Sequence, residues 1–535
     1  YVKASTETHA DAGDKANDAI RVDGAQLRVR CVGEGGNLGL TQLGRVEYAQ
    51  LGAAGHGGRI NTDFIDNSAG VDTSDHEVNI KILLAGAVQA GALDVERRNT
   101  LLASMTDEVA SLVLRDNYEQ NLALANAYAH RTSLLHVHED WMRELEQRGI
   151  IDRALEGLPD RREVRRRLDN GSGLTMPELS VLMAWTKIVL AEELLASDIP
   201  DDSYLAPDLV AYFPGALRSA YEERMRAHPL RREIVVTQIV NDLVNGAGMT
   251  FWTRLGGETG AGAADLTKAN FVAREIFGAA HLGAEIASYD NQIAAERQTR
   301  MRIEMRTLVE RSSRWLVTHR RAPMHAADTV EYLAERSREV LEALPRILVG
   351  RDREAFEGRR ARLTSQGVPV DLATRVAVLD PAYAALGIVE TAQQLALSAV
   401  EVAEVHFTLG ERLGLSTLMD RIFALPRSDR WQTMARAALR DDLYAVHQQL
   451  SESVLRTSGS TLDAAERVTE WEVAKEDVVA RAAKTLKEIW RDDEADLARL
   501  SVGLRVVRPL PPWAAVGEAA QPASPRAVRA ASTDC

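Results

Sequence analysis

The sequence predicts a short α/β region over residues 1–90, a large all-α region over residues 91–505 and a disordered tail over residues 506–535. Glycine is dense before residue 90, where short strand-like runs alternate with short helical ones. After residue 90, helical periodicity continues between brief polar breaks. The tail is rich in proline, alanine and serine, and such a segment buries too little surface to offset the entropy cost of ordering it.

In the first region, the spacing predicts a brief helix over 15–20, a strand over 27–32 and a helix over 43–51. A second short strand is expected over 59–65. A longer helix should begin near Gly70. Short alternating runs separated by glycine-rich turns are typical of an open α/β sheet.

In the second region, several helices have recognisable ends. The stretch 175–178, TMPE, is a capping box with proline in the first helical turn, and 398–401, SAVE, repeats the capping logic. The stretch 234–244 is apolar on most sides and is followed by Gly246 and Gly248. It is expected to form a central, largely buried helix with a glycine stop.

The composition is that of a globular protein, with 45% apolar and 27% charged residues. A chain of 535 residues exceeds the size of one ordinary core, so we expect several. The 78 acidic side chains outnumber the 64 basic ones, which disfavours a nucleic-acid partner. Charges interrupt every long apolar stretch, so neither a transmembrane helix nor a membrane partner is expected.

The two cysteines, Cys31 and Cys535, are too few to cross-link a chain of this size, and the first residues do not resemble an export signal. These features predict a reducing compartment, most simply the cytoplasm. The sequence starts at Tyr1 in a polar stretch without start-like features. We therefore expect a fragment of a longer protein.

The stretch 31–42, CVGEGGNLGLTQ, opens a glycine-rich turn after the first expected strand. A phosphate-binding first loop needs the spacing G-x-G-x-x-G, whereas Gly33, Gly35 and Gly39 give one residue more. Glu34 would also face a diphosphate at a Coulombic cost. The stretch is therefore a near miss for a pyrophosphate loop.

A second interpretation uses the loops after both expected strands, GEGGN at 33–37 and DNSAG at 66–70. Ligands of open α/β sheets lie beyond the carboxyl ends of the strands. Asn37 and Asn67 each offer an amide that donates and accepts hydrogen bonds, which suits a nicotinamide carboxamide. Alternatively, both asparagines only tie down their turns.

The segment after the second loop is rich in acidic residues. Asp72 and His76 lie four apart, so a metal site is one interpretation, but no second histidine or cysteine cluster is spaced to complete a shell. We expect no bound metal, because acidic residues in a first helical turn are favoured without a ligand. Ser74 is a candidate hydrogen-bond donor to an anionic group, with helix capping as the alternative.

Four longer stretches carry a resemblance to a known family. They are RVRCVGEGGNLGLTQLGRVEYA, GGRINTDFIDNSAGVDTSDHEVNIKILL, LTMPELSVLMAWTKIVL and HPLRREIVVTQIVNDLVNGAGMTFWTRL. They resemble the C-terminal part of the large bacterial NAD-specific glutamate dehydrogenases, from residue 1 to about residue 505. The resemblance implies NAD as cofactor and oxidative deamination of L-glutamate to 2-oxoglutarate and ammonia. The α/β region would then be the closing strands and helices of a Rossmann-like NAD-binding domain. The size and the apolar helix faces of the helical region suit a subunit interface, so a homo-oligomer is expected.

Two motifs of the small hexameric glutamate dehydrogenases can be laid on this sequence. Their E-G-A-N loop at the cofactor cleft resembles residues 34–37, which implies cofactor contacts for the residues of that loop, namely Gly35, Gly36 and Asn37. Their N-A-G-G-V-x-V-S motif resembles residues 67–74, with serine in place of alanine and alanine in place of glycine. It implies that Asn67 contacts the nicotinamide side, Val71 flanks the aliphatic chain of the substrate and Ser74 binds its distal carboxylate.

The resemblance also implies that the catalytic lysine and aspartate lie upstream of Tyr1. We therefore expect no catalytic residue in this chain and no dehydrogenase activity of the chain by itself. Two other interpretations stay open, a helical scaffold, oligomerisation or regulatory module without its own activity, and a metal-dependent hydrolase built on Asp72 and His76.

Overall fold

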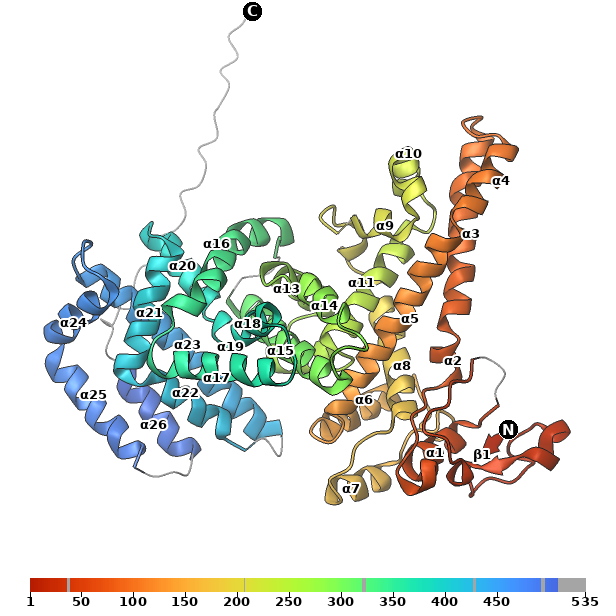
Figure 1. Ribbon diagram of the computed structural model, residues 1–535, viewed down its shortest axis with the longest axis horizontal. Coiled ribbons are helices and arrows are strands. Elements are labelled where there is room, and N and C mark those ends of the chain that lie inside the picture. Colours follow the sequence, from red (N-terminus) through yellow and green to blue (C-terminus); the bar gives the residue numbers. More distant parts are fainter. Residues whose placement is uncertain (36–38, 206, 320–323, 427–429, 492–495, 509–535) are drawn as a thin grey trace, which may run out of the picture. The chain divides into compact units, whose positions relative to one another are not determined.

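The structure is a computed structural model that describes residues 1–35, 39–205, 207–319, 324–426, 430–491 and 496–508 (Figure 1). Helices dominate these residues, as expected, and they form two compact units, Tyr1–Ala403 and Glu404–Cys535. None of the described helices combines the length and the apolar character that crossing a lipid bilayer demands.

The first sixty-odd residues form the only described region with strands. Strand β1 (Val2–Lys3) pairs in parallel with β2 (Val22–Asp23), and single parallel bridges join Val2 to Leu40 and Cys31 to Arg59. The helical elements here are η1 (Lys15–Ile20), η2 (Gly24–Gln26), α1 (Gln42–Gly55) and α2 (Asp63–Asp66). The helices predicted over 15–20 and 43–51 are confirmed. Two strands of two residues each do not by themselves identify a Rossmann-like domain.

The strands predicted over 27–32 and 59–65 are wrong. Between them the structure forms only the Cys31–Arg59 bridge, and α2 occupies the end of the second stretch. Along one edge of the 27–32 stretch, the carbonyl groups that a neighbouring strand would use are taken by α1. The main-chain N–H of Ala53 donates to Leu27, and the Tyr48 hydroxyl donates to Val29 at 2.9 Å. The alternating sequence pattern at 27–32 therefore forms an extended segment that packs on a helix instead of pairing within a sheet.

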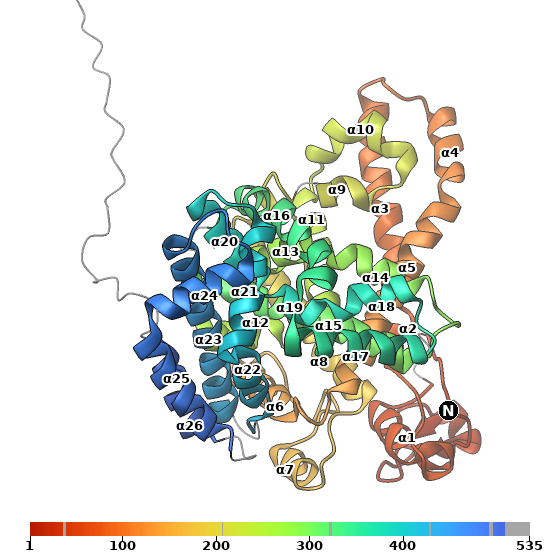
Figure 2. The same ribbon diagram turned by 60° about the vertical axis from the view of Figure 1, so that its left-hand side comes forward.

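Helix α3 (Ser68–Gln89) is the long helix that was expected to begin near Gly70. It leads through α4 (Val95–Ser104) into α5 (Thr106–Ala129), which packs against α3 (Figures 1 and 2). The boundary predicted at residue 90 follows the end of α3 and stays a prediction.

The rest of the first unit is helical. Its elements are α6 (Leu135–Gln147), α7 (Arg161–Asp169), α8 (Met176–Leu195), η3 (Ile199–Asp201), α9 (Pro207–Tyr212), α10 (Gly215–Arg226), α11 (Arg231–Ala247), α12 (Phe251–Thr259), α13 (Ala263–Ile276), α14 (Ala279–Ala287), α15 (Ala295–His319), α16 (Ala326–Ile347), α17 (Gly350–Ser365), α18 (Val370–Ala377), α19 (Leu379–Ala382) and α20 (Ala385–Leu395). Helix α8 packs against α5 and α11, and α13 packs against α15 and α16.

The start of α8 confirms the predicted capping box. Glu178 is almost fully buried, and its carboxylate accepts hydrogen bonds from the Thr175 main-chain N–H at 2.7 Å and from both terminal nitrogens of Arg167. The predicted buried helix with a glycine stop is also confirmed, because α11 ends at Ala247 and is followed by Gly248 with a φ of +94°. Only glycine adopts such a conformation at no cost.

The second unit is a smaller helical body. Helix α21 (Ala399–Leu413) begins where the capping pattern at 398–401 predicts, and the division between the two units falls within it. It is followed by α22 (Leu415–Ala424), α23 (Arg430–Thr457), α24 (Ala464–Ala474), α25 (Glu476–Ile489) and α26 (Leu497–Val507). Helix α26 packs against α22, α23 and α25. Residues 506 and 507, which were assigned to the tail, belong to α26, and residues 509–535 lie outside the described residues.

Candidate functional site

The two loops singled out in the sequence meet in the structure. The main-chain N–H of Glu34 donates a hydrogen bond to the Asp66 carboxylate at 3.0 Å. Gly35 lies directly against the second loop, since a Cβ atom built on it would be 3.8 Å from the main-chain nitrogen of Asn67. The expected contact residues Gly36 and Asn37 lie outside the described residues.

Glu34 does not project freely into the space beyond the loop. Its carboxylate pairs with the guanidinium of Arg45, which is only 1% exposed. Arg45 also donates to the main-chain oxygen of Asn61 at 3.2 Å. Arg45 of α1 thereby joins the glycine-rich loop to the segment that leads into α2, and the negative charge that argued against a bound phosphate is matched by a buried cation.

Side chains of helix α5 hold the second loop through hydrogen bonds. The side-chain amide of Asn117 donates to the main-chain oxygen of Ile65 at 2.8 Å and to the Ser68 hydroxyl at 2.9 Å. The amide of Asn61 donates to Asp66 at 3.1 Å and to the side chain of Asn121 at 2.8 Å. Asp66 is therefore held by Glu34 and Asn61, and the residues on either side of Asn67 are held by Asn117 of α5. These contacts together orient Asn67.

Asn67 itself is held through its main chain only. Its N–H donates to Asp63, and its carbonyl accepts from Gly70, but its side-chain amide makes no hydrogen bond to any described residue. The amide oxygen lies over Gly70, where an added Cβ would come within 2.9 Å of it. The alternative in which this asparagine ties down a turn with its side chain is therefore not what the structure shows.

Val71 and Ser74 follow Asn67 along one face of α3. Val71 is 60% exposed, and the exposed Ser74 hydroxyl makes no hydrogen bond within the described part of the chain. Ser74 lies in the second turn of α3, so it does not cap the helix. By contrast, the neighbouring Thr73 hydroxyl bonds back to the carbonyl of Ala69 at 2.7 Å. One apolar and two polar groups are thus presented together, and the polar groups have no side-chain partner in the part of the chain that the structure describes.

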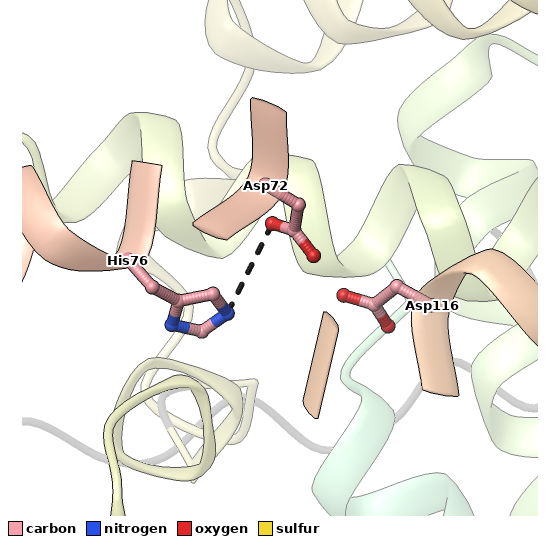
Figure 3. Close-up of side chains that lie close together, drawn as sticks. All are labelled: Asp72, His76 and Asp116. Carbon is pink, nitrogen blue, oxygen red and sulfur yellow. Dashed lines mark ion pairs between the residues drawn. The ribbon is translucent and has the colours of Figure 1, made fainter. Parts of the chain in front are cut away.

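The face of α3 that packs against α5 carries a second group. The side chains of Asp72 and His76 point toward that of Asp116 on α5, and one possible ligand atom from each lies within 4.8 Å of the others (Figure 3). Sequence reasoning missed Asp116, which is 44 positions from Asp72. Only the prediction that α3 and α5 pack as an antiparallel pair would have found it.

The electrostatics of this group are unusual. Burial, together with the negative charge of Asp72, raises the pKa of Asp116 to about 7. Burial lowers the pKa of His76 despite the nearby carboxylates. Burial also lowers the pKa of Lys187 on α8 to about 8, although Asp116 and Glu119 oppose that change. Perturbed pKa values gathered in one place are typical of functional sites.

Comparison with known proteins decides the family. A family model described as "Glutamate dehydrogenase, C-terminal" matches residues 171–509, which is more than half of the chain. The chain belongs to the glutamate dehydrogenase family. A second model, "Bacterial NAD-glutamate dehydrogenase, catalytic domain", matches residues 1–127. All the site residues described above except Lys187 fall within the region matched by that bacterial glutamate dehydrogenase model.

Curated relatives share this family. A protein of Mycobacterium tuberculosis named NAD-specific glutamate dehydrogenase is 42% identical over 508 residues, which cover 95% of this chain and 31% of the relative. Proteins of the same name from Halomonas elongata and Pseudomonas aeruginosa are 42% identical over 505 residues, covering 94% of this chain and 31% of each relative. The chain thus spans about a third of the length of these glutamate dehydrogenases.

Proposed function

We propose that this chain is the part of an NAD-dependent glutamate dehydrogenase that completes the cofactor cleft and contacts the substrate. The reaction is oxidative deamination of L-glutamate to 2-oxoglutarate and ammonia, with the hydride passing to NAD. The observation that carries the proposal is the side-chain amide of Asn67, which lies beside Gly35 and has no hydrogen-bond partner among the described residues, in a region matched by the catalytic-domain model of this family.

On the cofactor side, Asn67 bonds the carboxamide of the nicotinamide. An amide is suited to this because it donates and accepts at once, as the carboxamide does. The loop of Gly35, Gly36 and Asn37 approaches the cofactor through its main chain, which the small residues permit. In this proposal the region before α3 is the closing part of a Rossmann-like domain, and its parallel pairings support that assignment.

On the substrate side, Val71 flanks the aliphatic chain of glutamate and the Ser74 hydroxyl donates to its distal carboxylate. Both side chains are exposed on α3, and Ser74 has no competing partner among the described residues. Helix α3 therefore carries the nicotinamide contact, Asn67, at its N-terminal end and the substrate contacts, Val71 and Ser74, in its first two turns.

The reaction also needs a base that removes a proton from the amine and activates water on the iminium carbon, and cations that hold two carboxylates. We assign none of these groups to this chain, which matches about a third of each relative. The purified chain is then inactive by itself. Glutamate-dependent production of NADH by the purified 535-residue chain would contradict that assignment.

The roles of Asn67 and Ser74 are tested by alanine at the matching positions of the full-length Mycobacterium tuberculosis relative. Loss of the Asn67 amide should raise KM for NAD, and loss of the Ser74 hydroxyl should raise KM for glutamate. Each effect should be about tenfold, the size expected of one lost hydrogen bond to a polar or charged ligand group. Thr73→Ala is the matched control, because that hydroxyl already bonds within the helix. Unchanged kinetics in both variants would favour the scaffold interpretation.

The helical region serves, in this proposal, as a platform for a cytoplasmic homo-oligomer. Large apolar side chains lie on the surface of the second unit, with Trp431 75% and Val473 71% exposed. Burying such side chains is the main favourable contribution to subunit association. The mass of the chain measured by light scattering should exceed that of one copy, and Trp431→Ser should lower it. A monomeric mass at micromolar concentration would remove this part of the proposal.

A further inference from the structure

We propose that Asp72, His76 and Asp116 form a binding site for a divalent transition-metal ion, with Zn²⁺ as the expected occupant. The three side chains come from two packed helices, α3 and α5, and point toward one another (Figure 3). A bound ion would tie α3 to α5 directly behind the face that carries Ser74. The inference concerns binding and does not depend on the proposed dehydrogenase activity.

The observation that singles out this group is the state of His76. Its side chain is almost fully buried, and it makes no hydrogen bond to any described residue. Its Nε2 atom is directed at Asp72, but the separation from Oδ1 is 3.9 Å, which is too long for a hydrogen bond. The Nδ1 atom, which lacks a partner among the described residues, lies on the side of the ring away from the two carboxylates. Nε2 faces the carboxylates without a hydrogen bond, so it is the atom available to a group placed between them.

Asp72 faces the same position. Its second carboxylate oxygen, Oδ2, is buried, and within the described chain its one available donor is the carboxyl group of Asp116, which bonds to Asp72 only when protonated. Lys187, the cation that acts on Asp116, directs its ammonium group to the side-chain oxygen of Asn241 at 2.8 Å. Lys187 therefore acts on Asp116 through its charge, but no lysine or arginine among the described residues forms an ion pair or hydrogen bond with Asp72 or Asp116.

The donor set indicates which ion would enter. Two carboxylates and one imidazole suit Zn²⁺, which binds such ligands at about 2.0–2.2 Å and accepts a water as fourth ligand. Ligand atoms around such an ion are roughly 3.3 Å apart, so the side chains would close in from their present separation of up to 4.8 Å. Mg²⁺ prefers oxygen ligands alone and is expected to bind poorly here.

The ring of His76 is already oriented for this role. It stacks on Tyr212 with ring centroids 4.2 Å apart and an angle of 10° between the planes. Tyr212 is itself held by a hydrogen bond of 3.0 Å from the side chain of Asn79. The imidazole therefore loses little rotational freedom on binding, which favours a preorganised site.

The test uses the untagged 535-residue chain, stripped with a chelator and titrated with Zn²⁺ in competition with a chromogenic chelator. We expect one ion per chain and a higher Tm in its presence. Asp116→Asn and His76→Gln should each weaken binding by about tenfold to a hundredfold. Glu77→Gln is the matched control, because this exposed carboxylate lies on α3 outside the group and pairs with Lys81, and the variant should bind as the original chain does.

Two further measurements make the result decisive. Co²⁺ in place of Zn²⁺ should give visible absorption bands that change in the His76→Gln variant, which reports on the imidazole directly. Titration with Mg²⁺ should leave Tm unchanged. Failure of the original chain to bind Zn²⁺ at all would overturn the proposal without recourse to any variant. Binding that is equally tight in both ligand variants would overturn it as well.

Discussion

The main-chain N–H of Glu34 donates a hydrogen bond to the carboxylate of Asp66, 32 positions later in the sequence. This bond joins the glycine-rich loop to the loop that carries Asn67. It is a charge-assisted bond, and such bonds are stronger than neutral ones. The Asp66 carboxylate therefore contributes directly to the relative position of the two loops.

Asp66→Ala should separate these loops. Loss of a hydrogen bond to a charged group costs about 1.5–3 kcal/mol, so amide hydrogen exchange at Glu34 should become at least tenfold faster. At the matching position of a full-length relative, KM for NAD should rise. Asp63→Ala is the control on the same short helix. Unchanged exchange at Glu34 would show that other contacts hold the loop.

Gly70→Ala should have opposite effects on stability and on cofactor binding. Alanine stabilises a helix interior by up to about 1 kcal/mol relative to glycine, but its Cβ would lie 2.9 Å from the side-chain oxygen of Asn67 and push that amide aside. We expect a higher Tm in this chain and a higher KM for NAD in the full-length relative. Gly86→Ala on the same helix meets only an ordinary contact with Arg224, so it should stabilise without changing KM.

Glu178→Gln should destabilise the first unit strongly. The variant keeps the shape of the side chain but leaves the buried guanidinium of Arg167 with Glu163 as its remaining ion-pair partner. Breaking one partner of a buried pair costs about 3 kcal/mol or more. Scanning calorimetry should show the loss in the transition of the first unit. Glu192→Gln, an exposed carboxylate later in α8, should leave that transition unchanged.

The stability of the second unit should fall between pH 6.5 and 4. His406 and His447 stack with ring centroids 3.5 Å apart, and burial lowers the pKa of His447 to about 4 and that of His406 well below its usual value. In this window the unfolded chain binds protons that the folded unit does not, so the free energy of unfolding falls as the pH falls. The stabilisation is complete above about pH 6.5.

Thermal unfolding of the isolated 535-residue chain from pH 7 to pH 4.5 would measure this dependence. His447→Gln should make the curve for the second unit shallower, because one of the two protonation steps is removed. His281→Gln, at an exposed histidine of the first unit, should leave it as it was. A curve of the same steepness in both variants would show that other groups control the acid sensitivity.

The helices were predictable because their signals are local. Thr175 and Glu178 lie three apart and bond to each other, so the pattern contains both partners of the interaction. The strand over 27–32 was not predictable in this way. Whether an alternating run forms a strand depends on which donors bond to its carbonyl groups. Here Tyr48 and Ala53 of α1 donate to the carbonyl groups of Val29 and Leu27.

The residues of the candidate site also differ in whether the sequence alone could identify them. The family motif at 67–74 singled out Asn67, Val71 and Ser74, but the sequence pattern placed Asn67 in a loop before a helix expected from about Gly70, whereas α3 begins at Ser68. The sequence could not place Asp116 beside His76, since that proximity arises from the packing of α5 on α3 and leaves no mark in either stretch alone. Contacts within one element can be read from spacing, whereas contacts between elements need the fold.

Helix α3 presents Asn67 at its beginning and Ser74 seven residues later. Seven residues of α-helix advance by about 10 Å, and this advance is fixed by main-chain hydrogen bonds before any ligand arrives. Under the roles proposed above, the helix acts as a measuring rod for the ligand. The helix sets the distance between the nicotinamide held by Asn67 and the group that binds the distal carboxylate of the substrate. Aspartate, which is one methylene shorter than glutamate, would not reach Ser74 with its reacting carbon at the nicotinamide, so chain-length selectivity would follow from the pitch of a helix.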